Sequence, residues 1–98
     1  MTTSDLPHDP TDDQWRIENA RRLAGLTLHF RRYARWREEW DHDHCAACWA
    51  MFAEYDGPDI LHEGYATGPD YPKGVGYEWV CPTCFSDLAG RLGWTAAE

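Results

Sequence analysis

The chain has 98 residues, of which 43% are hydrophobic, so it can form one small domain with a thin core. Asp and Glu outnumber Lys and Arg by 17 to 9, and this net charge of −8 argues against general binding to DNA or RNA. The longest apolar run is nine residues, from Cys45 to Ala53, whereas a membrane span needs about 20. Composition therefore predicts a cytoplasmic domain without a membrane segment, in which a metal or disulfides support the small core.

Positive charge is concentrated in one stretch of the chain. Seven arginines and a single acid, Glu18, lie between Arg16 and Arg37, which gives +6 there. The rest of the chain holds two basic residues and 16 acids, which gives −14. A basic patch on an acidic body is one interpretation, but surface charges usually balance locally. We therefore expect these arginines to pair with acids of the same chain.

The first predicted element is a helix. Residues 1–10 hold two prolines and few apolar side chains, which predicts a flexible acidic tail before a single domain of residues 11–98. Thr11 fits the first position of a capping box at the start of the helix. The apolar stripe of this helix includes Trp15, and Gly25 is the expected end.

A strand and a long loop region are expected next. Apolar and polar residues alternate over 26–33, which favours a half-buried strand, with a continuing helix as the competing interpretation. Glycine and proline are frequent over 55–76, which indicates loops around a short element at 60–65. A second strand is expected at 77–80, before a helix whose apolar face lies within 85–92.

Two Cys-x-x-Cys pairs, Cys45 with Cys48 and Cys81 with Cys84, carry the strongest chemical signal. Two intervening residues let both sulfurs face one ion while the backbone amides turn toward the thiolates, and two pairs complete a tetrahedral shell that suits one structural zinc ion. Disulfides would need an oxidising compartment that nothing indicates; a redox-active pair and an iron–sulfur cluster are further alternatives. A closed shell of four thiolates leaves no open position for water, so it predicts a structural role.

The position of the second cysteine pair predicts the fold. It lies between a predicted strand and a predicted helix, and the free N–H groups of a helix N-terminus favour thiolates. A zinc knuckle followed by a ligand pair at a helix N-terminus is the treble-clef arrangement. A zinc ribbon, with both pairs on hairpins, is the alternative. We therefore predict an α+β, zinc-stapled single domain with an N-terminal helix, a short antiparallel sheet and a C-terminal helix.

An Asp-His-Asp-His string that contains His42 and His44 directly precedes Cys45. It resembles a stretch of the recombination endonucleases of the His-Asn-His type, in which a histidine activates water and a metal is bound. In those enzymes the stretch lies between the cysteine pairs, and the only asparagine of this chain, Asn19, is far from the expected place. We therefore predict no enzymatic activity. His42 or His44 would instead hydrogen-bond a thiolate, cap the knuckle or contact a partner.

Two further pairs of residues are candidates for partner contacts. His62 and Glu63 are adjacent in a loop, where such residues are more often surface groups than acid–base catalysts. Trp36 and Trp40 lie among charges, and exposed tryptophan beside arginine is typical of protein interfaces, with core filling as the alternative. We expect most of the six tryptophans to pack around the metal, including Trp49, which follows a cysteine.

The strings WDHDHCAACWAMF, LHEGY and EWVCPTCFSDL together resemble a family of small bacterial zinc-binding proteins, and the likeness extends over residues 15–94. The resemblance implies that the four cysteines are metal ligands, and it carries no activity. The small stand-alone members look like immunity or accessory proteins. We therefore predict a non-enzymatic protein-interaction domain with a basic protein partner. A nucleic-acid adaptor acting through the arginine stretch and a metal-dependent nuclease are the alternatives.

Overall fold

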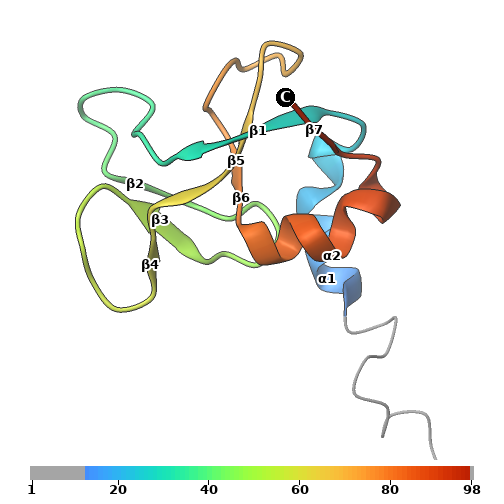
Figure 1. The fold of residues 1–98 in the computed structure, drawn as a ribbon, viewed down its shortest axis with the longest axis horizontal. Helices are drawn as coiled ribbons and strands as arrows, with labels where there is room; N and C mark the ends of the chain where they lie inside the picture. The colour runs from blue at the N-terminus through green and yellow to red at the C-terminus, as the bar shows by residue number, and fades with distance from the viewer. Residues whose placement is uncertain (1–12, 98) are drawn as a thin grey trace, which may run out of the picture.

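The computed structural model describes residues 13–97, which form a short helix, two small sheets and a longer second helix (Figure 1). Helix α1 (Gln14–Ala20) continues into a 3-10 turn, η3 (Arg21–Leu23). Gly25 follows with a φ of 80°, a left-handed conformation that favours glycine and ends the helical segment as predicted. The predicted tail of residues 1–10 and Thr11 lie outside the described residues.

The larger sheet has the strand order β6-β5-β1-β7. Its strands are β1 (Thr27–Arg32), β5 (Glu63–Thr67), β6 (Trp79–Val80) and β7 (Thr95–Ala96). The pairs β1–β5 and β5–β6 are antiparallel, whereas β7 runs parallel to β1. The strand expected over 26–33 is thus confirmed, and the strand expected over 77–80 is shorter than predicted.

The smaller sheet has the order β2-β3-β4, with strands β2 (His42–His44), β3 (Met51–Ala53) and β4 (Ile60–Leu61). β2 and β3 form an antiparallel hairpin, and β4 lies parallel to β3. The predicted α+β fold with a short antiparallel sheet is confirmed, and the structure adds a second sheet and one parallel pair in each sheet. The connections explain the two parallel pairs. The loop of residues 54–59 returns the chain to the start of β3, so β4 runs parallel to β3, and α2 carries the chain back to the start of β1, so β7 runs parallel to β1.

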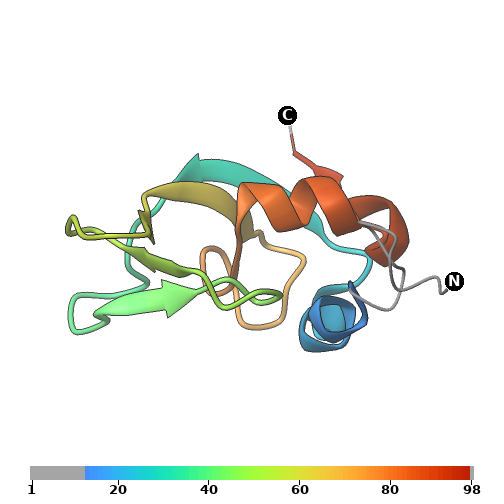
Figure 2. The same ribbon diagram turned by 90° about the horizontal axis from the view of Figure 1, so that it is seen from below.

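Helix α2 (Pro82–Leu92) closes the fold. Cys81 is its N-cap, and Pro82 occupies the first turn, where no N–H is needed for a helical hydrogen bond. Gly93 ends the helix with a φ of 74°, as the sequence predicts. Both helices lie in one half of the molecule, and the small sheet lies at the other end (Figure 2). None of the helices within residues 13–97 has the length and apolar character required to cross a membrane.

Aromatic side chains fill the space between the two sheets. The ring centroid of Trp79 lies 4.9 Å from that of Tyr33 and 5.4 Å from that of Phe52. All three side chains are buried. Gly64 on β5 faces this layer, and a Cβ there would lie 2.8 Å from the Phe52 ring, so glycine is the residue that fits.

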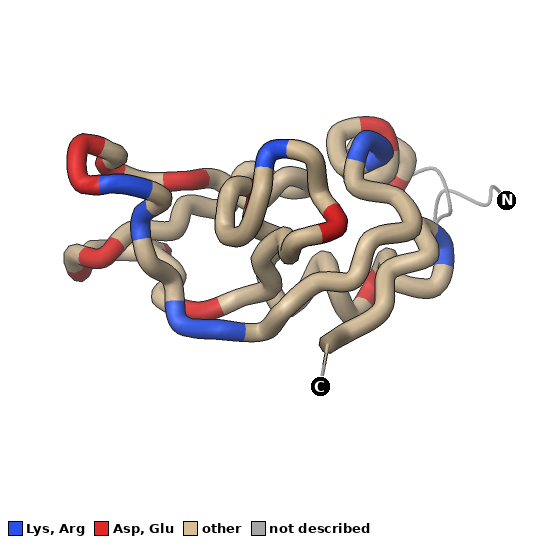
Figure 3. Tube along the Cα trace, turned by 90° about the horizontal axis from the view of Figure 1, so that it is seen from above, with Lys and Arg blue, Asp and Glu red and all other residues tan. Residues whose placement is uncertain are grey.

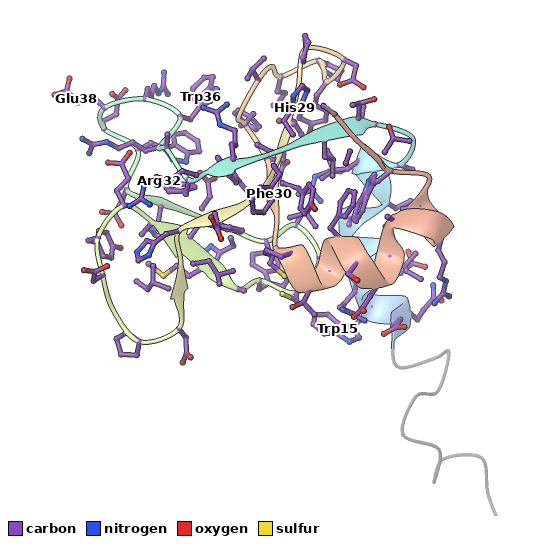
Figure 4. The ribbon with its side chains drawn as sticks, viewed as in Figure 1. Trp15, His29, Phe30, Arg32, Trp36 and Glu38 are labelled. Carbon is purple, nitrogen blue, oxygen red and sulfur yellow. The ribbon has the colours of Figure 1, made fainter. Side chains whose placement is uncertain are left out.

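A second row of rings lies on the other side of the larger sheet. Phe30 and Tyr65 face each other on β1 and β5 with centroids 5.1 Å apart, and Tyr65 stacks on Phe85 of α2 at 3.8 Å. Figure 4 labels Phe30 on β1, and this residue is 51% exposed. These contacts fasten α2 to the sheet and so fix the position of the helix N-terminus.

Two tryptophans lie outside the predicted core. Trp15 is 51% exposed, because α1 turns Arg16, Asn19 and Ala20 inward and leaves Trp15 on the outer face. Trp49 is 63% exposed, because it ends the first cysteine pair with a φ of 71° and its side chain leaves the knuckle. The expectation that most tryptophans surround the metal was therefore wrong for these two.

Candidate metal centre

The first cysteine pair forms the turn of the β2–β3 hairpin. The turn is closed by backbone hydrogen bonds: the Cys45 amide donates to the Ala50 carbonyl at 2.7 Å, and the Trp49 amide donates to the Cys45 carbonyl at 3.0 Å. Inside it, the Ala47 amide donates to the Sγ of Cys45 at 3.4 Å. The amides between the cysteines therefore turn toward a sulfur, as expected for a metal-binding knuckle.

The second pair lies at the start of α2 and is joined to the knuckle by the backbone. The amide of Cys84 donates to the Sγ of Cys81 at 3.4 Å, which caps the helix. The amide of Cys81 donates to the Sγ of Cys45 at 3.2 Å, and the amide of Ala46 donates to the carbonyl of Trp79 at 2.8 Å. A knuckle on a hairpin and a pair at a helix N-terminus form the treble-clef arrangement, so the zinc ribbon was the wrong alternative.

The four sulfurs are spaced to surround one ion. They lie within 4.8 Å of one another, and those of Cys48 and Cys81 are 3.7 Å apart. A zinc–sulfur bond of about 2.3 Å gives a tetrahedron with edges of about 3.8 Å. All four cysteines are free thiols, and sulfur atoms gather at the beginning of α2 (Figure 4). The cluster could therefore bind a metal ion.

The thiols strongly influence one another. Hydrogen bonds from the thiols of Cys81 and Cys84 lower the pKa of Cys45 to about 2. The hydrogen bond to Cys45 raises the pKa of Cys81 to about 12, and contact with Cys45 also raises the pKa of Cys84 far above its ordinary value. The sulfurs are therefore close enough to share protons with one another, and a divalent cation would displace these protons.

Helix α1 supports the metal centre through two polar side chains that the sequence analysis did not assign to it. The Arg16 guanidinium lies 3.5 Å from the Sγ of Cys84 and 3.1 Å from a carboxylate oxygen of Asp87, and it also pairs with Asp13. Its side chain is only 12% exposed. The Asn19 amide donates to the Ala47 carbonyl at 2.9 Å. Their spacing of three residues, on the face that buries Ala20, is the signal that could have identified them.

His42 and His44 lie on one face of β2, beside the knuckle. Their ring centroids are 4.9 Å apart, and His42 Nδ1 is 2.7 Å from a carboxylate oxygen of Asp41. Among residues 13–97, the cysteine sulfurs accept hydrogen bonds from backbone amides and Arg16, and from neither histidine. The expected bond from a histidine to a thiolate is thus not what the structure has, because these donors already occupy that role.

The two histidines line a groove of about 300 Å³ together with residues of α1, η3 and the knuckle and with Glu78, which precedes β6. Within the described part of the chain, the four cysteines are the one group of three or more His, Cys, Asp or Glu residues spaced for a metal. Asp43 points to the opposite face of β2, where it accepts hydrogen bonds from Tyr33 at 2.7 Å and Trp40 at 3.0 Å. Asp43 also contributes to the lining of the groove, but its carboxylate is engaged by these two aromatic side chains and is not spaced with the histidines for a metal.

His62 and Glu63 do not form an acid–base pair. The His62 Nε2 lies 3.1 Å from the Tyr55 carbonyl and 3.3 Å from a carboxylate oxygen of Asp56. Glu63 is exposed at the start of β5. The histidine thus holds the loop between β3 and β4, and the glutamate lies on the surface.

Trp36 and Trp40 form a small aromatic cluster with Tyr77. The centroid of Trp36 lies 5.5 Å from that of Trp40 and 5.2 Å from that of Tyr77. The guanidinium of Arg37 lies 4.8 Å from the Trp36 centroid, a cation–π contact. Trp36 is 37% exposed and Trp40 is half-buried. The cluster joins the β1–β2 loop to the segment before β6 and exposes one tryptophan face beside an arginine.

The arginines do not form one basic face. Figure 3 shows basic and acidic segments interspersed over the molecule, with several basic segments beside acidic ones. Five of the seven arginines in the basic stretch form ion pairs with carboxylates of the same chain: Arg16, Arg21, Arg22, Arg35 and Arg37. This local pairing agrees with the expectation from composition.

No protein-family model, curated protein or solved structure matches this chain. The family resemblance stated for the sequence motifs therefore stays a prediction. What the chain does has to be argued from the cysteine cluster, the surrounding hydrogen bonds and the surface.

Proposed function

We propose that this chain is a non-enzymatic protein-interaction domain, held together by one structural zinc ion and acting as an immunity-type inhibitor or accessory protein. The closed cysteine cluster carries this proposal. Four thiolates fill every position of a tetrahedral ion, and three of the four cysteines are at most 5% exposed. Such a shell has no open position for water or substrate, so it supports a structural role.

Zinc is the metal that the donor set favours. Soft thiolate ligands in a tetrahedral arrangement select zinc or iron–sulfur chemistry, and sulfurs within 4.8 Å of one another surround a single ion. Elemental analysis of protein purified without added metal should find about one zinc per chain. A protein that folds with free thiols and no metal, or one that holds iron, would contradict this assignment.

The surface favours a basic protein as the partner. Tyr55, Asp56, Asp59 and Glu63 are all exposed, and they lie on the β3–β4 loop and at the start of β5; we call them the acidic loop surface. Tyr55 supplies an aromatic side chain that is 45% exposed. Acidic groups around an exposed aromatic ring suit a cationic partner, because opposite charge speeds the encounter and the ring supplies contact area.

The experiment compares two double variants that change the net charge equally. Asp59→Asn with Glu63→Gln removes two of the three carboxylates of the acidic loop surface, and asparagine tolerates the φ of 62° at position 59. Glu18→Gln with Asp70→Asn is the matched control on other parts of the surface. Proteins captured from the host are identified, and association rates of the purified partner are measured from low salt to about 0.15 M and above.

We expect a basic partner that associates more slowly as salt rises, with a further loss for the loop variant and none for the control. A gel shift with mixed DNA and RNA and a plasmid-cleavage assay with divalent metals run in parallel. A competable nucleic-acid shift without a captured protein would favour the adaptor. Cleavage that requires His44 would favour the nuclease.

A further inference from the structure

We infer that Cys48 is the reactive sulfur of the cysteine cluster, a modification site for hydroperoxides whose oxidation opens the metal shell. The inference rests on the proposed zinc site and adds a regulatory property to it. Two independent features distinguish Cys48 from the other cysteines: its exposure and its hydrogen bonds.

Exposure is the first difference. Cys45, Cys81 and Cys84 are 1%, 5% and 1% exposed, whereas Cys48 is only partly buried. The chain turns outward immediately after Cys48, where Trp49 adopts a φ of 71°. Cys48 is therefore the cysteine that a small oxidant can reach most readily, and access is one determinant of cysteine oxidation.

Hydrogen bonding is the second difference. The Sγ of Cys45 accepts from two backbone amides, that of Cys81 accepts from one amide, and that of Cys84 accepts from the Arg16 guanidinium. Within residues 13–97, the polar contact of the Cys48 sulfur is with Cys81 alone, 3.7 Å away. A hydrogen-bond donor withdraws electron density from a thiolate. We therefore expect the sulfur of Cys48, which accepts from neither an amide nor a guanidinium, to be the most nucleophilic of the four.

The contact with Cys81 also determines the second half of the reaction. The Cys48 thiolate attacks a peroxide oxygen: an S–O bond forms, the O–O bond breaks, and the leaving oxygen takes a proton to give water or an alcohol. The Cys81 thiolate then attacks the Cys48 sulfur, an S–S bond forms, and hydroxide leaves and becomes water. Two thiolates are oxidised to one disulfide, and the peroxide is reduced by two electrons.

The product would link the knuckle to the helix N-terminus. A disulfide between Cys48 and Cys81 leaves Cys45 and Cys84 as the remaining thiolates, and two ligands hold a metal ion far less tightly than four. We therefore expect peroxide to release the metal from the protein, and a dithiol reductant with added zinc to restore it.

The test uses the zinc-loaded protein and begins with metal analysis. A limiting amount of N-ethylmaleimide is added, and peptide sequencing by mass spectrometry measures the labelling of each cysteine. We expect Cys48 to react at least about tenfold faster than any other cysteine. Hydrogen peroxide in a second sample should release one zinc per disulfide formed, and the disulfide should map to Cys48 and Cys81.

A matched pair of variants tests the role of hydrogen bonds. Arg16→Gln removes the charged donor to Cys84 and should raise the labelling of Cys84 severalfold, while the labelling of Cys48 stays the same. Arg21→Gln, in an exposed ion pair with Glu18, should leave all four rates unchanged. If Arg16→Gln fails to fold, the order in which the four cysteines of the unsubstituted protein are labelled still tests whether Cys48 is the most reactive.

Faster labelling of Cys45, Cys81 or Cys84, or equal rates at all four, would overturn the inference while leaving the zinc site intact. A zinc-loaded protein from which peroxide releases no zinc would likewise overturn the inference and leave the zinc site intact. A protein that contains no zinc at the outset would instead overturn the proposed metal centre. The initial metal analysis therefore separates failure of the two proposals.

Discussion

The cysteine cluster and the loop end of the molecule are held in different ways. Around the cluster, backbone amides and a 12% exposed guanidinium fix the sulfurs from several elements at once. At the loop end, residues 34–41 and 54–59, surface contacts dominate, such as the pair of Arg35 and Glu54, whose side chains are 45% and 44% exposed. Exposed ion pairs stabilise proteins by less than about 1 kcal/mol. We therefore expect changes at the cluster to affect folding, and changes at the loop end to affect mainly what the surface presents to a partner.

The largest effect should come from opening the metal shell. Cys84→Ser replaces a buried thiolate with a poor zinc ligand, and apparent binding energies of structural zinc in small domains reach about 10–16 kcal/mol. We expect loss of cooperative thermal unfolding, followed by circular dichroism, and the same result after zinc is removed with a chelator. A variant that melts like the unsubstituted protein would show that the metal is peripheral to folding.

The same substitution at both ends sharpens the comparison. Arg16→Gln removes a charge that contacts Cys84 and Asp87 and pairs with Asp13, and the Arg16 side chain is only 12% exposed. Asp13 keeps its longer pair with Arg91, at 3.6 Å. We expect a loss of about 3 kcal/mol in the free energy of unfolding. Arg35→Gln breaks the exposed pair with Glu54 and should cost less than about 1 kcal/mol. Equal losses in denaturant titrations would contradict the proposed difference between the two ends.

A packing change inside the core should have an intermediate effect. A methyl group at Gly64 would lie 2.8 Å from the Phe52 ring and 2.9 Å from the Val80 carbonyl, so Gly64→Ala should destabilise by about 2 kcal/mol. Gly90→Ala is the matched control in α2, where nothing lies within 4 Å. It should stabilise the protein by up to about 1 kcal/mol, because alanine favours the helix. Melting temperatures of the two variants should therefore move in opposite directions.

The parts of the fold that sequence predicted are those with short-range signals. The paired cysteines, the strand over 26–33 and the helix end at Gly93 all follow from patterns within a few residues. The treble-clef arrangement followed as well, because one cysteine pair directly precedes a helical apolar face. Local pattern and tertiary structure agree at these positions.

The features that sequence did not predict depend on contacts between distant segments. The role of Arg16 requires α1 to pack beside a helix that begins 66 residues later, from position 16 to position 82. The parallel pairing of β7 with β1 joins the last strand of the described chain to the first. Trp49 is exposed because it adopts a left-handed backbone conformation at the end of the knuckle. The hydrophobicity of the sequence does not indicate this conformation. Composition suggests a buried tryptophan there, and backbone geometry decides otherwise.

The smallest effect is expected next to the cluster, at His42 and His44. Their rings contact each other at 4.9 Å and line the surface groove, and His42 pairs with the exposed Asp41. Because the sulfur shell is complete without them, the double variant His42→Ala with His44→Ala should keep one zinc per chain and lose less than about 1 kcal/mol of stability. Metal analysis and denaturant titration check both values. A loss of zinc would mean that a histidine, and not one of the four cysteines, completes the metal site. Strand β2 would then belong to the metal-dependent region of the fold together with the cysteine cluster.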